Sequence, residues 1–408
     1  MDDAHRAVEH AARDGYGRLV AWIATRCGDV ELAEDAVADA LEAALRSWPE
    51  SGVPRNPEAW LLTAARRKMI DRGRRGQTRR DAAQRLRMEA EEAAEVPFRT
   101  SLPDRRAELL FVCAHPSVPR AMRTPLMLQL VLGLDAARIG SAMLVKPATM
   151  GQRLVRAKRR IADENLRFEV PEPSALAERL PPVLDAIYAA YGTGWDDEPG
   201  GRSTGLAAEA IWLARTLVAR LPRAAEALGL YGLMLHCEAR RSARRAPGGR
   251  FVPLDEQDPA AWDGTLLEEA EKALYLAARE RTPGPYQLEA TIQSIHADRR
   301  RTGKVDGRAL HEAYGVLVAK YPTLGAWIGR AASFGRLGRP AEGLALLDRL
   351  EADAVQRHQP YWAVRAHLAR LQRREDEAQA AYERAMGLTE DPAVRRWLDA
   401  RRRAGPAQ

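Results

Sequence analysis

The chain has 408 residues, of which 46% are hydrophobic and only 6% aromatic, and its formal net charge is +7. This length accommodates two or three domains. Alanine, leucine, arginine and glutamate dominate, and runs of alternating Val, Ile, Thr and Tyr are absent, so an all-α fold is expected. The positive charge suits a polyanionic partner without requiring one, because 56 acidic residues remain. No window approaches the ~18 consecutive apolar residues of a membrane span, and the polar N-terminus does not resemble a signal peptide, so we expect no membrane partner.

The three cysteines, Cys27, Cys113 and Cys237, are far apart in the sequence. They form no disulfide framework and fit a reducing cytoplasm, which is the expected location. Cys113 and His115 suggest a metal site, but no second pair accompanies them, so a core cysteine and a capping or buried histidine are expected instead. The chain has no Ser/His/Asp order around an elbow, no Gly-rich phosphate loop and no HExxH. The prediction is therefore a protein that is not an enzyme and has no cofactor and no metal.

Two amphipathic helices are expected at the N-terminus. Residues 4–25 form the first, with Val8, Leu19, Trp22 and Ile23 in the core. Asp29 is placed to cap the second, ELAEDAVADALEAALRSW. Its apolar stripe comprises Leu32, Ala36, Val37, Ala40, Leu41 and Leu45, and its outer surface is acidic.

A basic helix follows the turn-rich loop PESGVPRNP and begins near Pro57. Eight Lys or Arg and one acid, Asp71, lie between Arg66 and Arg80. This face could follow a phosphate backbone. By itself, however, such a charge run is more often a solvated helix face.

Residues 124–161 read as helix, turn, helix, turn and basic helix. Gly133 is expected to end the first helix in a left-handed conformation, and Asp135 to cap the second ahead of Ile139 and Met143. Pro147 opens the third helix, where its missing N–H costs nothing. The pattern is typical of a helix-turn-helix whose last helix enters a major groove, although a helical hairpin with a solvated basic face is the alternative.

The order of these elements resembles the extracytoplasmic-function (ECF) sigma factors of the sigma-70 family. Three blocks carry the resemblance, namely ELAEDAVADALEAAL, PEAWLLTAARRKMIDRGRR and the helix-turn-helix ending in ATMGQRLVRAKRRI. It spans roughly residues 5–168 and implies core RNA polymerase and promoter DNA as partners. It also implies that the loop from Gly52 to Pro57 receives a base flipped out of the −10 element.

The resemblance implies a role for each matching residue. Polymerase docking is assigned to Asp35, Asp39 and Glu42. Contact with −10 DNA is assigned to Arg55, Asn56, Arg66, Arg67, Lys68, Asp71, Arg72, Arg74 and Arg75. Contact with −35 DNA is assigned to Lys146, Thr149, Gln152, Arg153, Arg156 and Arg159.

The resulting division places sigma region 2 at 1–87, a linker at 88–100, sigma region 4 at 101–168, a second, partly extended linker at 169–180 and a helical extension at 181–408. Helices are expected at 181–191, 205–221, 223–240, 264–280, 286–297 and 307–320, interrupted by turn-rich patches at 192–204 and 245–263.

A repeat of 35 residues marks the end of the extension. Trp327, Ala331, Gly343, Leu347 and Leu350 recur as Trp362, Ala366, Ala378, Tyr382 and Ala385. The period resembles that of tetratricopeptide repeats, which implies a protein or peptide partner, while packing against the sigma domains is the alternative. The whole chain resembles a sigma subgroup with such a fused domain. It departs from that subgroup at Gly192–Gly194 and in WIGRAASFGRLG. The cluster Asp255 to Asp258, with Trp262, is a candidate contact to the basic sigma surface.

We therefore expect a sigma factor that directs promoter-specific initiation and is regulated by its extension. A helix-turn-helix regulator that does not engage polymerase is the first alternative. A scaffold protein that acts through its repeats is the second.

Overall fold

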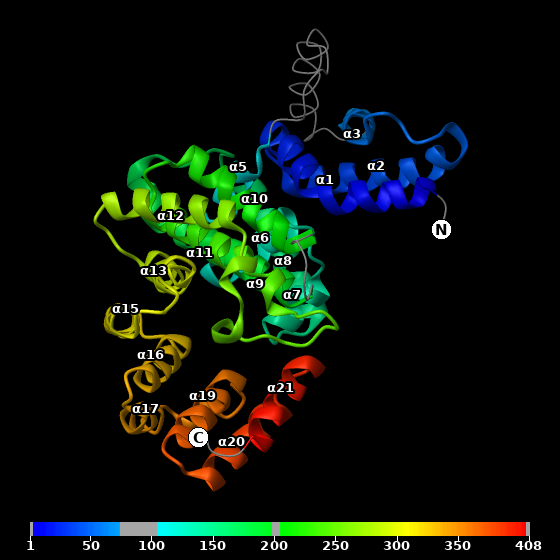
Figure 1. Cartoon of the computed structure of the whole chain (residues 1–408). Coiled ribbons are helices and arrows are strands. Elements are labelled where there is room, and N and C mark those ends of the chain that lie inside the picture. The colour runs from blue at the N-terminus through cyan, green and yellow to red at the C-terminus, as the bar shows by residue number, and fades with distance from the viewer. Residues whose placement is uncertain (1–2, 74–103, 198–204, 405–408) are drawn as a thin grey trace. The chain divides into compact units, whose positions relative to one another are not determined.

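The computed structural model describes residues 3–73, 104–197 and 205–404. Within these ranges every regular element is a helix, and the only strand-like pairing is an isolated bridge between Arg245 and Phe251 (Figure 1). The all-α expectation, with two small helical domains followed by a helical repeat, is confirmed. None of the described helices is long and apolar enough to cross a membrane.

The described residues divide into two compact units. The first holds the helices up to α8, α9 as far as Trp195 and α10 as far as Leu217, and the second holds the last two residues of α9 and the chain from Val218 onward. The helices that begin in the first unit are α1 (Asp3–Cys27), α2 (Val30–Ser51), α3 (Pro57–Gly73), α5 (Arg106–Cys113), α6 (Arg120–Leu130), α7 (Ala136–Ala142), α8 (Pro147–Asp163), α9 (Pro173–Asp197) and α10 (Gly205–Arg220).

Local sequence signals set the helix ends of the first unit. The Asp29 carboxylate accepts a hydrogen bond from the Leu32 backbone N–H at 3.0 Å, and Asp135 accepts one from Arg138 at 2.7 Å. Gly133 has a φ of +67°, and Pro147 is the first residue of α8. The predicted caps and the helix-turn-helix are thus confirmed.

The predicted core of the first unit is largely correct, with two exceptions. Val8, Leu19, Trp22 and Ile23 are all buried. Leu45 and Met143, however, are about two-fifths exposed, and Leu144 is almost fully exposed in a left-handed backbone conformation. Leu45 lies between Ala44 and Trp48, which are both buried, so it is on a more exposed side of α2 and not beyond the packed part of the helix. Met143 and Leu144 form the turn between α7 and α8, where the chain reverses at the surface.

Two glycines permit close backbone approaches. A Cβ at Gly17 of α1 would collide with the Val131 carbonyl oxygen at the end of α6. A Cβ at Gly140 of α7 would lie 2.6 Å from the Val145 carbonyl oxygen. Glycine lowers helix propensity by roughly 1 kcal/mol. At Gly140 that cost is offset by packing that no larger residue could reproduce.

The segment after the helix-turn-helix is helical earlier than predicted. Residues 169–180 are expected to be partly extended because they are rich in proline, yet α9 begins at Pro173 and continues through Pro181 and Pro182. The predicted turn at 192–197 is also wrong, because α9 includes these residues. A Cβ at Gly194 would collide with the Ala207 backbone nitrogen, so this glycine lets α9 and α10 meet.

Helices α9 and α10 pack against α5 of the helix-turn-helix domain. Arg106 of α5 is buried and makes ion pairs with Asp104, at 2.8 Å, and with Glu209 of α10. Its guanidinium also lies over the Trp212 ring, 4.5 Å from the centroid. Arg179 of α9 donates to the Phe111 carbonyl. The first part of the extension therefore shares a core with the helix-turn-helix domain.

The second unit is a succession of helical hairpins with irregular segments between them. Its elements are α11 (Ala225–Ala239), η2 (Ser242–Arg244), η3 (Leu254–Glu256), η4 (Pro259–Ala261), α12 (Gly264–Arg279), α13 (Pro285–Ala297), α14 (Arg299–Thr302), α15 (Gly307–Lys320), α16 (Leu324–Arg336), α17 (Pro340–Leu347), α18 (Ala352–Val355), α19 (Gln359–Leu371), α20 (Glu375–Gly387) and α21 (Pro392–Arg403). The hairpin α16–α17 recurs as α19–α20. Ala331 and Ala366 are fully buried at matching positions, and a Cβ at Gly343 would lie 2.6 Å from the Ala331 carbonyl oxygen. Small residues thus let the paired helices approach.

Candidate nucleic-acid interface

Helix α8 presents one buried face and one basic face. Met150, Leu154, Ala157 and Ile161 are buried in the domain. The candidate −35 contacts lie on the opposite side. All are exposed except the half-buried Thr149, and they comprise Lys146, Thr149, Gln152, Arg153, Arg156 and Arg159. Polar side chains near the N-terminus of the helix, followed by guanidinium groups, can read base edges and hold phosphates.

Lys158 does not belong to that basic face. It is buried, and its Nζ lies 2.7 Å from a carboxylate oxygen of Glu34 on α2. The Tyr16 hydroxyl donates to the other Glu34 oxygen at 3.1 Å. Burial and the nearby Glu34 charge raise the pKa of Tyr16, so its hydroxyl keeps the proton that it donates. These three side chains join the N-terminal helices to the helix-turn-helix.

The loop before α3 holds two candidate −10 contacts. Arg55 and Asn56 are both exposed. The Asn56 side-chain oxygen accepts a hydrogen bond from the Ala59 N–H at 3.1 Å, so this side chain also caps α3. The loop starts at Gly52, whose φ of +82° ends α2. The edge-to-face rings of Trp48 and Trp60, 5.5 Å apart, fix the two helices that flank the loop.

The basic side chains of α3 differ in their surroundings. Arg66 is half-buried, with its guanidinium over Trp22 at 4.2 Å from the ring centroid, whereas Arg67 is exposed and Lys68 is partly exposed. Asp71 and Arg72 belong to the backbone of α3, but their side chains lie outside the described part of the chain. Arg74, Arg75 and the predicted linker at 88–100 lie outside the described residues.

The acidic side of α2 carries the candidate polymerase contacts. Asp35 and Glu42 are exposed and Asp39 is half-exposed, at spacings that place all three on one side of the helix. Glu42 lies 3.7 Å from Arg46 in an exposed pair that stabilises little. Glu34 points to Lys158 instead, so adjacent acids of this helix have different roles.

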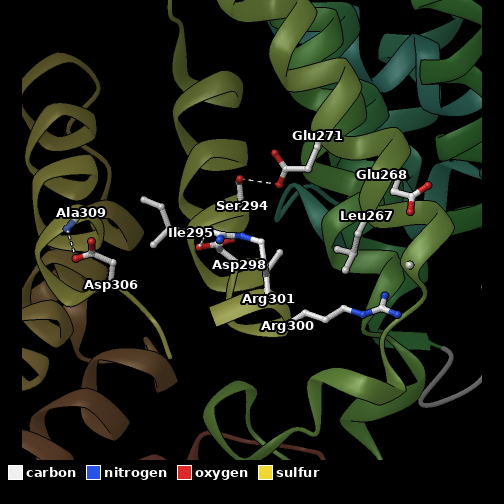
Figure 2. Close-up of a pocket in the computed structure, with 12 residues that line it drawn as sticks. Leu267, Glu268, Glu271, Ser294, Ile295, Asp298, Arg300, Arg301, Asp306 and Ala309 are labelled. Carbon is white, nitrogen blue, oxygen red and sulfur yellow. Dashed lines mark hydrogen bonds and ion pairs between the residues drawn. The ribbon is translucent and has the colours of Figure 1, made fainter. Parts of the chain in front are cut away.

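Outside the first unit, a groove of about 920 Å³ opens between α12, α13 and α15 (Figure 2). Its polar groups largely bind one another. Ser294 donates to Glu271 at 2.6 Å, and Arg301 pairs with Asp298 at 2.9 Å. Asp306 caps α15.

Cys113 and His115 lie in surroundings that are typical of residues with a structural role. Cys113 is fully buried, and burial raises the pKa of its thiol. The Nδ1 atom of His115 accepts the Ser117 backbone N–H at 3.2 Å. Among the described residues no group of three potential metal ligands forms.

The sequence pattern predicts Lys158 on the outward basic face and Glu34 on the acidic outer surface. Both predictions are wrong, because the two side chains pair with each other and Tyr16 also binds Glu34. A signal was present, because Lys158 follows Leu154 by four residues and Ile161 follows Lys158 by three. A lysine on the apolar stripe of a helix requires a partner, but the sequence does not identify that partner.

Residues 13–80 match the family described as Sigma-70 region 2, and residues 179–278 match a family of unknown function, DUF6596. An uncharacterized protein of Rhizobium meliloti (strain 1021) is 33% identical over 378 residues, covering 88% of this chain and 86% of that protein. No solved structure matches.

The matches indicate the class of protein. A Sigma-70 region 2 domain containing α2, the loop and α3 supports an RNA polymerase sigma factor of the sigma-70 family, which implies interaction with core RNA polymerase. The chain belongs to one family with the Rhizobium meliloti protein, since their similarity extends over nearly the full length of both.

The ion pair between α2 and α8 is open to a direct test. Glu34→Gln or Lys158→Met leaves the remaining partner largely buried without its counter-charge, so each should lower the free energy of unfolding by about 1–3 kcal/mol. The double variant should be destabilised by less than the sum, with a coupling of about 0.5–3 kcal/mol. Urea unfolding measures all three variants, with the exposed neighbour Arg159→Met as the control. Additive effects would show that the two side chains do not interact.

Proposed function

We propose that this protein is a sigma factor of the ECF type that directs promoter-specific transcription initiation in the cytoplasm. It contributes binding and DNA recognition, and no enzymatic chemistry of its own. In this proposal region 2 comprises residues 1–87 and region 4 residues 101–168, joined by the linker at 88–100. The joint at 169–180 leads to the extension.

One observation carries the proposal. Within the Sigma-70 region 2 match, an acidic exposed side of α2 is followed by an exposed loop and a basic helix. A helix-turn-helix with a basic outward face then completes the set. A sigma factor needs these three surfaces in this order, because it must bind polymerase and two promoter elements.

The mechanism assigns one step to each surface. Asp35, Asp39 and Glu42 dock on core polymerase. The loop at 52–57 receives a base flipped from the −10 element, a step that costs a few kcal/mol and less where the strand is already opening. Arginines of α3 hold the neighbouring phosphates, and the outward face of α8 reads the −35 element from the major groove.

The extension resembles tetratricopeptide repeats and is proposed to regulate initiation. Its hairpins recur every 35 residues with small residues at their crossings, an architecture that offers extended surfaces to other proteins. The architecture is present although the chain departs from the sigma subgroup at Gly192–Gly194 and in WIGRAASFGRLG. Gly194 serves the approach of α9 to α10, and WIGRAASFGRLG forms α16 and the turn after it.

A helix-turn-helix regulator that does not bind polymerase remains the competing function. It would use the basic face of α8 in the same way. Only the acidic side of α2 distinguishes the two, so the first experiment addresses that side.

Charge reversal on α2 should abolish polymerase binding. The full-length protein is expected to co-elute with core RNA polymerase on a sizing column at moderate salt. Asp35→Arg/Asp39→Arg should abolish that complex, because both changes place like charges against a basic docking surface. Glu50→Arg, an exposed acid near the end of the same helix, is the matched control. A wild-type chain that never co-elutes would favour the competing function.

Removal of guanidinium groups from α8 should weaken promoter binding. Arg153→Ala/Arg156→Ala should lower affinity for promoter DNA in the polymerase complex and reduce the steepness of its salt dependence by about one for each phosphate that the variant no longer holds. Arg120→Ala, on an exposed part of the same domain, is the control. Equal effects of the two would exclude α8 as the reading helix.

The regulatory role of the repeats is tested by truncation after Leu217. This cut preserves the packing of α9 and α10 on α5, whereas a cut after Glu172 would strand the buried Arg106. Promoter-dependent transcription should change with the shorter chain. Unchanged output would refute regulation by the repeats.

A further inference from the structure

One loop of the second unit has a stem that is held by hydrogen bonds in which the side chains of its tip take no part. We define the acidic loop as residues 245–262. The Val252 N–H donates to the Arg244 carbonyl at 2.8 Å, and the Gln257 side chain donates to the Val252 carbonyl at 3.1 Å. The Trp262 indole N–H then donates to Gln257 at 3.1 Å. Gln257 and Trp262 are both buried, so the stem of the loop is fixed.

The tip of the loop consists of Asp255 and Glu256, and both are exposed. The Asp255 carboxylate pairs with Arg336 at the end of α16, and the Glu256 carboxylate pairs with Arg401 of α21. Arg299 of α14 donates to the Asp255 carbonyl at 3.0 Å. One short acidic segment thus binds arginines from three separate helices of the array, α14, α16 and α21.

These three residues, Arg299, Arg336 and Arg401, are defined here as the arginine face. The Trp397 indole N–H adds a donor, 3.4 Å from the Glu256 carboxylate. Two guanidinium groups therefore meet the side-chain carboxylates of the tip, and the third holds its backbone. The face has the chemistry that recognises paired carboxylates, which here lie next to each other in the 3-10 turn η3.

The hold on the tip is weak compared with the hold on the stem. The side chains of the Arg336–Asp255 pair are 30% and 63% exposed, and those of the Arg401–Glu256 pair are 47% and 34% exposed. Ion pairs this accessible to solvent are worth about 0–1 kcal/mol each. Carboxylates from another segment could therefore replace the tip without unfolding the stem.

We propose that the arginine face is a binding site for an acidic peptide segment of a partner protein, and that Asp255 and Glu256 are its resident occupants. The loop acts as a tethered competitor. A tethered competitor has an effective concentration in the millimolar range, which lowers the apparent affinity of any partner. The array is then a receptor whose site is filled until a partner with more carboxylates displaces the tip.

Fluorescence anisotropy with a labelled peptide, VPLDEQDPAAW, tests the proposal on the full-length chain. The unmodified chain should bind it weakly. Asp255→Asn/Glu256→Gln keeps the shape of the tip and removes its charges, so it should bind the peptide about tenfold more tightly. Asp348→Asn removes a comparably exposed carboxylate that pairs with Arg365 at 2.6 Å, and should change nothing.

Two further measurements identify the site. Adding Arg336→Gln/Arg401→Gln to the tip variant should abolish binding, whereas Arg308→Gln, an exposed arginine of α15, should not. The peptide VPLNQQNPAAW, which lacks the carboxylates, should bind to none of the proteins. A tip variant that fails to bind the acidic peptide would overturn the proposal. Binding that is indifferent to Arg336 and Arg401 would also overturn it, and the loop would then be a structural brace. Neither result depends on polymerase binding.

Discussion

The ion pair between Glu34 and Lys158 is the interaction on which the arrangement of the first unit depends. It joins α2 to α8 where both side chains are almost removed from water, and Tyr16 satisfies the second carboxylate oxygen. A buried charge must be paired, because an unpaired one costs several kcal/mol. Lys158 points inward together with the apolar residues Leu154 and Ile161, whereas the candidate DNA contacts of α8 lie on its outward face. The same reasoning applies to α2, where Glu34 faces α8 and Asp35 faces solvent. One buried pair therefore separates the structural residues from the proposed binding residues on both helices.

Close backbone packing also joins helices along the first unit. Gly17 lets α1 meet the end of α6, and Gly194 lets α9 meet α10. Arg106 then links α5 to α10 through Glu209 and Trp212. Helices α9 and α10 are thus joined to the helix-turn-helix by a shared core before the hairpin array begins. A chain that ends at Leu217 keeps this core whole, which is why the cut isolates the contribution of the repeats.

The array combines rigid and replaceable contacts. Small residues at its crossings, such as Gly343 and Ala366, hold the hairpins through dispersion and burial, which salt does not weaken. Exposed ion pairs at the tip of the acidic loop are weak and sensitive to salt. The sequence pattern makes this acidic cluster a candidate contact to the sigma surface, whereas the structure pairs its carboxylates with arginines of the array itself. A partner can compete for the second kind of contact without disturbing the first.

The sequence alone was sufficient for the local features of this protein. Asp29, Asp135, Gly133 and Pro147 each act on their immediate neighbours, so their caps and turns could be predicted from type and spacing. The helical period likewise placed Leu154 and Ile161 inside and Arg153 outside. Only the tertiary structure decided the contacts between distant residues. It paired Lys158 with Glu34, placed Arg66 over Trp22, and left Leu45 and Met143 exposed. It also continued α9 through Pro181 and Pro182, against their local preference. Local propensities act within about one helical turn, whereas burial depends on which surfaces meet, and no single stretch of sequence contains that information.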